Sequence, residues 1–315
     1  MTAPAITPSV SAATLEQVER LKRQATYAAV GVAGTLIIIK LAAWAITGSV
    51  SILASLVDSS LDLLASAINL MAVRHALEPA DHEHRFGHGK AEAIAGMGQA
   101  AFIAGSGFFL AFESLTRLIR PEPITTGWLG IAVMIVSLAL TLGLVWFQHR
   151  VLVQTRSLAI AADRFHYLTD IASNSAVLLA LVLTLWLGWI WADAAGGLAI
   201  AIFVLWGAYK ILRGSYDELM DREMADAERA RIQDIVRSHP GVRSMHDLRT
   251  RRAGHKVFIQ LHLDLPPDMT LLEAHVISDA VEAKLIAAFP GAEVLIHQDP
   301  EGIDEVKLDH AVGQG

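Results

Sequence analysis

The sequence predicts an α-helical membrane protein with six transmembrane helices, followed by a small α+β domain. The chain is 53% hydrophobic and only 18% charged, and its mean hydropathy of +0.44 exceeds that of ordinary soluble domains. Several segments of about 20 residues, the length that crosses a bilayer, carry no charge. After about residue 214 the chain becomes charged and mixed, as expected for a domain in water.

The composition also excludes several classes of protein. The chain has no cysteine, so it can form neither disulfides nor thiolate zinc sites, and a bound metal must be held by its 13 histidines and its carboxylates. A net charge of −7 without a basic cluster argues against nucleic acid as a partner. The first 24 residues are polar before any apolar stretch, so we expect a cytoplasmic arm rather than a signal peptide.

Apolar segments predict the membrane helices in order. Residues 25–73 are long enough for two helices, with a turn at Gly48 and Ser49 between them. This stretch is interrupted by Lys40, Asp58 and Asp62, and charges inside a membrane usually mark function. Helices three to six are expected over residues 93–112, 128–147, 171–191 and 194–209.

The distribution of lysine and arginine predicts the orientation of these helices. The loops between six helices alternate between two sides, and one side receives Arg117 and Arg120 as its only basic residues. Because positively charged loops stay in the cytoplasm, both termini are expected to face the cytoplasm.

The last third of the chain predicts an α+β domain in the order αββαβ, typical of a sandwich with helices on one face of a sheet. Its elements are expected over residues 226–238, 242–252, 256–265, 271–289 and 293–297. We therefore divide the chain into an arm (1–24), a membrane domain (25–213), a linker (214–224), the α+β domain (225–300) and a tail (301–315).

Two polar pairs in the membrane segments predict a metal site. Asp58 and Asp62 are four residues apart and so share one face of a helix, as do His166 and Asp170. Burying two anions together is unfavourable unless a cation lies between them. Three carboxylates and one imidazole suit a tetrahedral divalent ion such as zinc. The alternative is that the acids pair with Lys40 or lie near water at a helix end.

A second candidate site lies in the loop DHEHRFGHGK at residues 81–90. Asp81, His84 and His88 could hold a metal at the cytoplasmic mouth, because the glycines let the loop fold around it. Alternatively, this is a solvated polar loop.

Histidines recur in the α+β domain. The expected sheet carries His246, His262, His297 and Asp299, and the second helix of this domain carries His275. A single histidine is more often a surface or core residue than a ligand, but convergence from several elements favours a metal site.

Three separated motifs resemble those of the cation diffusion facilitators. They are GSVSILASLVDSSLD at residues 48–62, FGHGK at residues 86–90 and HYLTD at residues 166–170. Within this family the chain is similar to the bacterial zinc/ferrous-iron–proton antiporters. The likeness covers nearly the whole chain after about residue 25.

The resemblance implies a homodimer in the lipid of the bacterial inner membrane that exchanges cytoplasmic metal for external protons and carries a metallochaperone-like domain. Zn²⁺ is the expected substrate and regulatory ion, with Fe²⁺, Cd²⁺ and Co²⁺ as alternatives. The implied sites are a transport site (Asp58, Asp62, His166 and Asp170), a loop site (Asp81, His84 and His88), a binuclear cytoplasmic site (His246, His262, His275, His297 and Asp299) and a charge interlock (Lys90 and Asp221).

We therefore expect a proton-coupled metal exporter rather than an enzyme. A membrane metal sensor would share the soluble domain, but it would have little use for four ligands inside the membrane. An intramembrane aspartyl protease needs one aspartate on each of two helices, not pairs at i and i+4 together with a histidine.

Overall fold

The computed structural model describes residues 11–119, 128–187 and 191–302. The chain divides into two compact units, a helical unit over Glu19–Tyr216 and a second unit, here called the C-terminal unit, that contains the chain from Asp217 onward and the residues up to Val18. Most of the predicted tail and Arg120 lie outside the described residues.

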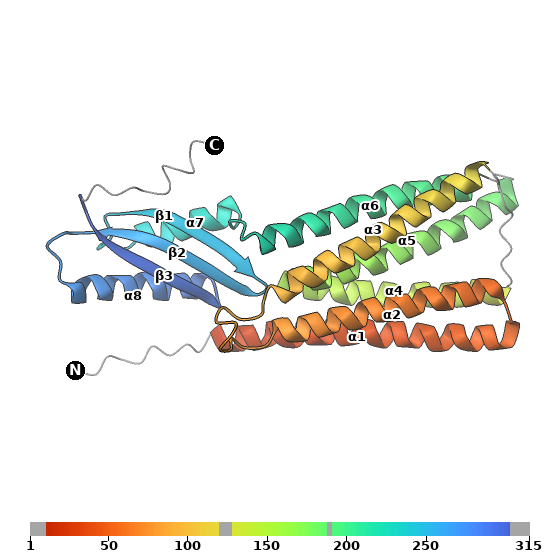
Figure 1. Cartoon of the computed structure of the whole chain (residues 1–315), viewed down its shortest axis with the longest axis horizontal. Coiled ribbons are helices and arrows are strands. Elements are labelled where there is room, and N and C mark those ends of the chain that lie inside the picture. The colour runs from red at the N-terminus through yellow and green to blue at the C-terminus, as the bar shows by residue number, and fades with distance from the viewer. Residues whose placement is uncertain (1–10, 120–127, 188–190, 303–315) are drawn as a thin grey trace. The chain divides into compact units, whose positions relative to one another are not determined.

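The helical unit confirms the predicted helical membrane domain (Figure 1). Its described helices are α1 (Ser11–Thr47), α2 (Val50–Ala76), α3 (Ala91–Ile119), α4 (Trp128–Thr155), α5 (Leu158–Leu187) and α6 (Ala192–Leu219). Among the described residues, five of these helices, all except α5, are long and apolar enough to cross a membrane. Residues 188–190 of the fifth predicted span lie outside the described residues.

Two helices extend well beyond the apolar segments that predict them. Helix α1 begins at Ser11, inside the expected arm, and α5 begins at Leu158, ahead of the expected start at residue 171. The added turns carry charged residues such as Lys22 and Asp163, which are buried in the helical unit. Hydropathy cannot detect these turns, because their polar side chains find partners inside the protein rather than in water.

Helix α5 lies at the centre of the unit, because it contacts α2, α3 and α4. The side chain of Tyr167 on α5 is almost fully buried. On α6, Gly207 approaches the ring of Phe165 so closely that a Cβ atom there would overlap it. This packing fixes which face of α5 points toward α2.

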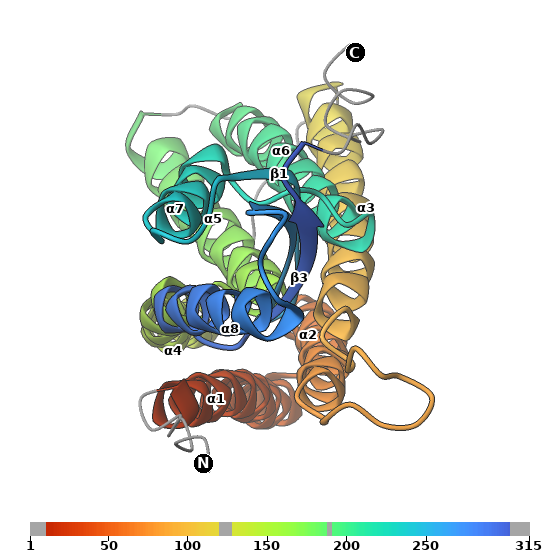
Figure 2. The same ribbon diagram turned by 90° about the vertical axis from the view of Figure 1, so that its left-hand side faces the viewer.

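Helices α1 and α2 lie side by side in the view of Figure 2 and are joined by a tight turn. Gly48 has a φ of 63°, in the left-handed region that glycine adopts without a steric penalty. About two turns from this turn, the two helices are joined by Lys40 of α1, whose Nζ donates to Oγ of Ser59 at 2.6 Å and to the carbonyl of Ser55 at 3.1 Å, both on α2.

The C-terminal unit confirms the predicted αββαβ order. Its elements are α7 (Asp226–Arg237), β1 (Ser244–Ala253), β2 (Lys256–Leu265), α8 (Leu271–Ala288) and β3 (Ala292–Pro300). Strand β2 is central, antiparallel to β1 and parallel to β3. Both helices cover one face of the sheet (Figures 1 and 2), where Ile232, Ile259 and Val281 are fully buried in the core.

Candidate functional site

The first cluster of polar residues joins α2 to α5 inside the helical unit. Asp62, His166 and Asp170 each place one ligand atom within 4.8 Å of the others. Nε2 of His166 lies 2.9 Å from Oδ1 of Asp62 and 3.8 Å from Oδ2 of Asp170. The two i, i+4 pairs thus face each other across adjacent helices, as the spacing predicts.

Asp58, the fourth predicted ligand, lines the same cavity but is not one of the three residues in this close group. The cavity has a volume of about 910 Å³ and is also lined by Asp62, His166 and Asp170. We call this space the central cavity.

Lys40 does not neutralise the acids through an ion pair in the described part of the chain. Its ammonium group is bonded to Ser59 and the carbonyl of Ser55 instead. Asp62 and His166 are only 8% and 5% exposed, and buried acidic groups are unfavourable without a compensating cation. The geometry therefore provides oxygen and nitrogen ligands that a divalent cation would satisfy.

A layer of polar side chains lies next to this cluster, around Asp163. The carboxylate of Asp163 accepts hydrogen bonds from Nε2 of Gln148 at 2.6 Å, Nε2 of Gln99 at 3.3 Å and Oγ of Ser66 at 3.4 Å. Asp163 lies one turn before His166 on α5 and is not among the predicted site residues.

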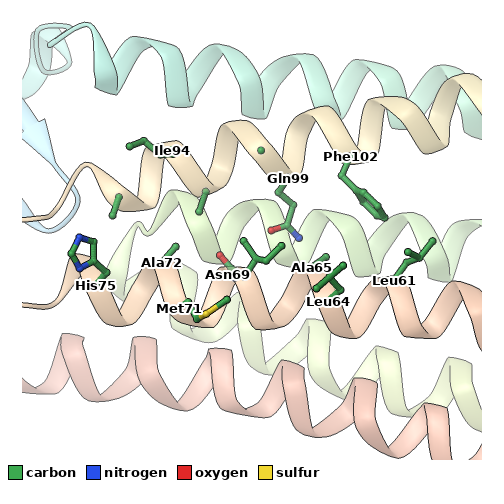
Figure 3. Close-up of a pocket in the computed structure, with 14 residues that line it drawn as sticks. Leu61, Leu64, Ala65, Asn69, Met71, Ala72, His75, Ile94, Gln99 and Phe102 are labelled. Carbon is green, nitrogen blue, oxygen red and sulfur yellow. The ribbon is translucent and has the colours of Figure 1, made fainter.

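A seam between α2 and α3 carries a second, apolar pocket of about 690 Å³ (Figure 3). Leu61, Phe102 and Met71 are among its lining residues, and its polar lining residues are Asn69, Gln99 and His75.

The loop between α2 and α3 brings its three predicted ligands together. Asp81, His84 and His88 form one of the groups whose ligand atoms lie within 4.8 Å of one another. Oδ2 of Asp81 lies 3.3 Å from Nε2 of His88. Backbone N–H groups of His84 and Glu83 donate to Asp81 and lower the pKa of its carboxyl group. This carboxylate is thereby kept ionised and ready to bind a cation.

Sequence reasoning missed a second group that shares His88. His75 at the end of α2, Glu78 and His88 also place ligand atoms within 4.8 Å of one another. Nδ1 of His75 lies 2.7 Å from Oε2 of Glu78, and the His75 and His88 rings are 4.5 Å apart. The i, i+3 spacing of His75 and Glu78 was the available signal, but these residues lie between the predicted span, which ends at residue 73, and the loop motif at residues 81–90.

The C-terminal sheet aligns three histidines in one row. The register pairs His246 with His262 and His262 with His297. Asp299 lies beside this row: its Oδ2 is 2.8 Å from Nδ1 of His262 and 3.6 Å from Nε2 of His246, and its Oδ1 is 3.1 Å from Nε2 of His297. Strand alternation and register therefore place four of the predicted ligands on one patch.

Two residues change the details of this patch. Asp264 was not predicted, yet its Oδ2 lies 3.4 Å from Nδ1 of His246, and it pairs in register with Asp299. His275 is not part of the close group among the described residues. It lies on α8, is exposed, and has its Nε2 3.5 Å from Oδ2 of Asp279.

The proposed interlock residues belong to different units of the chain. Within the C-terminal unit, Oδ1 of Asp221 lies 3.3 Å from Nη1 of Arg251. The pairing of Lys90 with Asp221 stays a prediction.

Two family models match the chain. The cation efflux transmembrane domain matches residues 26–220, and the cytoplasmic domain of cation efflux proteins matches residues 224–301. Among similar proteins, the cation-efflux pump FieF of Klebsiella pneumoniae is 46% identical over 284 residues, covering 90% of this chain and 94% of that one. FieF of Salmonella agona is 47% identical over 281 residues, covering 89% and 93%.

Solved structures match the C-terminal part of the chain at low TM-scores. A structure of CzrB is 37% identical and covers 25% of this chain and 99% of that one, with a TM-score of 0.25. The metal-bound C-terminal domain of the CzcD transporter from Thermotoga maritima is 27% identical and covers 26% and 100%, also with a TM-score of 0.25.

Proposed function

The chain belongs to the cation efflux family and is a multi-pass membrane transporter of divalent cations, and from that premise we propose that it exports zinc in exchange for protons. The exchange would occur at the site formed by Asp58, Asp62, His166 and Asp170. Family membership sets aside the sensor and protease alternatives.

The observation that carries this proposal is the group formed by Asp62, His166 and Asp170, whose ligand atoms lie within 4.8 Å of one another inside the helical unit. One imidazole and several carboxylates match the preference of zinc for nitrogen and oxygen ligands in a four-coordinate site. Fe²⁺, Cd²⁺ and Co²⁺ accept similar ligands and remain the alternative substrates.

Proton coupling follows from the chemistry of these ligands. A histidine binds metal only when neutral, and an aspartate binds it best when ionised, so metal and protons compete for the same lone pairs. Protons entering from outside would release the ion there, and loss of those protons to the cytoplasm would restore the site. Access to the two sides must alternate, because otherwise protons and metal would leak through together.

We further propose that the protein acts as a homodimer in the inner membrane with both termini in the cytoplasm. The match to the cytoplasmic domain of cation efflux proteins supports the first point, and the lysine and arginine distribution supports the orientation. Zinc binding at the His246, His262 and Asp299 patch would regulate transport by favouring one conformation of the dimer.

Flux of radioactive zinc into everted membrane vesicles under an imposed proton gradient tests the main proposal. Uptake should require the gradient and should be abolished by Asp62→Asn, which keeps the shape of the side chain but removes its charge. Glu113→Gln is the matched control, since Glu113 pairs with Arg117 on α3 away from the cluster. Gradient-dependent uptake that survives Asp62→Asn would refute this transport site, and uptake without a gradient would refute proton coupling.

The regulatory proposal is tested separately with His262→Ala in the same vesicles. Zinc flux in this variant should rise less steeply with zinc concentration than flux in the parent protein. Transport equal to that of the parent would contradict regulation by this patch.

A further inference from the structure

Asp163 is a fully buried carboxylate that the proposed transport site does not use. It is only 1% exposed and lies on α5 one turn before His166. Its three hydrogen-bond donors, Gln148, Gln99 and Ser66, come from three other helices, α4, α3 and α2. The Asp163 side chain therefore links four helices by hydrogen bonds.

The same network continues to a fifth helix through Tyr167. The hydroxyl groups of Tyr167 and Ser66 lie 2.8 Å apart, and the hydroxyl oxygen of Tyr167 lies 3.4 Å from the carbonyl oxygen of Ala29 on α1. We call this set of side chains the Asp163 layer; it consists of Ser66, Gln99, Gln148, Asp163 and Tyr167.

The Asp163 layer lies on one side of the metal ligands only. Ser66 follows Asp62 by one turn of α2, and Asp163 precedes His166 by one turn of α5, and both steps lead away from the turn between α1 and α2. The lining of the central cavity runs in the opposite direction, from Asp62 and His166 to Ala54 and Asn174. The cavity thus extends toward the α1–α2 turn and is closed by the layer at its other end, which the basic loops assign to the cytoplasm.

An unused partner for this layer lies beside it. Asn69 is one turn beyond Ser66 on α2 and is 2% exposed, yet neither its Nδ2 nor its Oδ1 has a hydrogen-bond partner in the described part of the chain. Figure 3 shows the amides of Asn69 and Gln99 pointing into the same pocket from facing helices. An unpaired buried amide is unfavourable, so Asn69 is an available partner for the Gln99 amide when Gln99 leaves Asp163.

We propose that the Asp163 layer is the barrier between the transport site and the cytoplasm, and that Asp163 is a positioning residue which holds the barrier closed while the central cavity faces outward. When the barrier opens, the Gln99 amide breaks its hydrogen bond to Asp163 and bonds to Asn69 instead. Helices α2 and α3 then separate from α5 on the cytoplasmic side. The inference rests on the proposed function in taking the central cavity as the transport path and the side of the basic loops as the cytoplasm.

Side-specific thiol labelling tests this barrier without measuring metal flux. The chain contains no cysteine, so Ser173→Cys introduces a single thiol, at a position that lines the central cavity. A membrane-impermeant methanethiosulfonate reagent is applied to everted and to right-side-out vesicles, and the ratio of the two labelling rates is compared with and without Asp163→Ala. Thr155→Ala is the matched control, because Thr155 is a buried polar residue of α4 whose Oγ1 has no partner in the part of the chain that the structure describes.

Asp163→Ala removes all three hydrogen bonds to a charged group, so it should raise cytoplasmic relative to external labelling by at least roughly tenfold. Thr155→Ala should leave the ratio unchanged. Gln148→Met, which removes only the 2.6 Å bond, should shift the ratio in the same direction by less, and it keeps the test available if Asp163→Ala does not fold. An unchanged ratio in both variants would overturn the proposal. So would an equal rise on both sides, since that indicates general loosening of the helices. Failure of zinc flux alone would count against the proposed function and not against the barrier.

Discussion

Nε2 of His166 lies 2.9 Å from Oδ1 of Asp62, so one hydrogen bond joins the two helices that carry the proposed transport site. In this arrangement a proton occupies the place between two atoms that would both face a metal ion. Metal binding must displace that proton, so binding is sensitive to pH. In the absence of metal, the same hydrogen bond holds α2 against α5.

Replacing His166 with aspartate should change the metal that is transported. An all-carboxylate site suits harder ions such as Mn²⁺, whereas imidazole favours zinc. We expect His166→Asp to lower zinc flux by more than roughly tenfold, the effect of losing a few kcal/mol of ligand binding, and to raise the ratio of manganese to zinc flux. Competition between the two metals in everted vesicles measures this ratio. An unchanged ratio would show that His166 does not select the ion.

The loop site should lose metal on acidification through its histidines and not through Asp81. The backbone N–H groups of His84 and Glu83 lower the pKa of Asp81. A carboxyl group with a lowered folded-state pKa keeps its contribution to the loop above its ordinary range and loses it only as the pH falls through the lowered value. A histidine binds a metal only when it is neutral, so protons compete with the metal for His84 and His88.

Zinc titration calorimetry of the full chain at several pH values checks this order. The variant His246→Ala/His262→Ala is used as the background, so that the C-terminal patch does not contribute. Asp81→Asn should weaken loop binding at every pH without moving its midpoint. A midpoint near the ordinary carboxylate range, about pH 4, would contradict the assignment.

The sequence predicted those features that depend on short-range periodicity. The i, i+4 spacing of Asp58 with Asp62 and the αββαβ order follow from patterns within one element or between neighbours. It could not reveal that Asp163 collects donors from α2, α3 and α4, because these partners are 15 to 97 residues away along the chain. Likewise, the contact of His246 with Asp264 depends on strand register, which hydropathy alone does not fix.

Lys22 and Glu92 form a buried ion pair whose loss should destabilise the helical unit. Nζ of Lys22 donates to Oε1 of Glu92, and Oγ of Ser157 donates to Oε2, so the pair joins α1, α3 and the start of α5. Both charged side chains are fully buried. Lys22→Ala would leave the carboxylate without its cation, and such changes cost about 3–5 kcal/mol.

Thermal unfolding in detergent, followed by tryptophan fluorescence, measures this cost. The double variant Lys22→Met/Glu92→Gln should recover most of the stability, because it removes both charges together. Glu113→Gln breaks a half-exposed pair with Arg117 and should change stability by less than about 1 kcal/mol. If Lys22→Ala were as mild as this control, the pair would not be buried as the structure shows.

The C-terminal patch should bind zinc mainly through His262 and Asp299. Asp299 lies 2.8 Å from His262 and 3.1 Å from His297, so it can bridge two ions or orient two imidazoles. Loss of a group that only orients a ligand typically weakens metal binding by roughly 10- to 100-fold, and loss of a ligand should weaken it at least as much. Zinc titration of the full chain should therefore show a large loss of affinity in His262→Ala. It should show little change in His239→Ala, because His239 is a turn residue that accepts from the backbone of Gly241.

The variant His275→Ala tests whether His275 is a zinc ligand, as the sequence predicts, or lies outside the site, as the contacts within the described chain indicate. Because His275 is paired with Asp279 on α8, its substitution should cost less affinity than that of His262. An equal loss would mean that His275 reaches the site in the assembled protein, and no loss in His262→Ala would exclude this patch as a metal site.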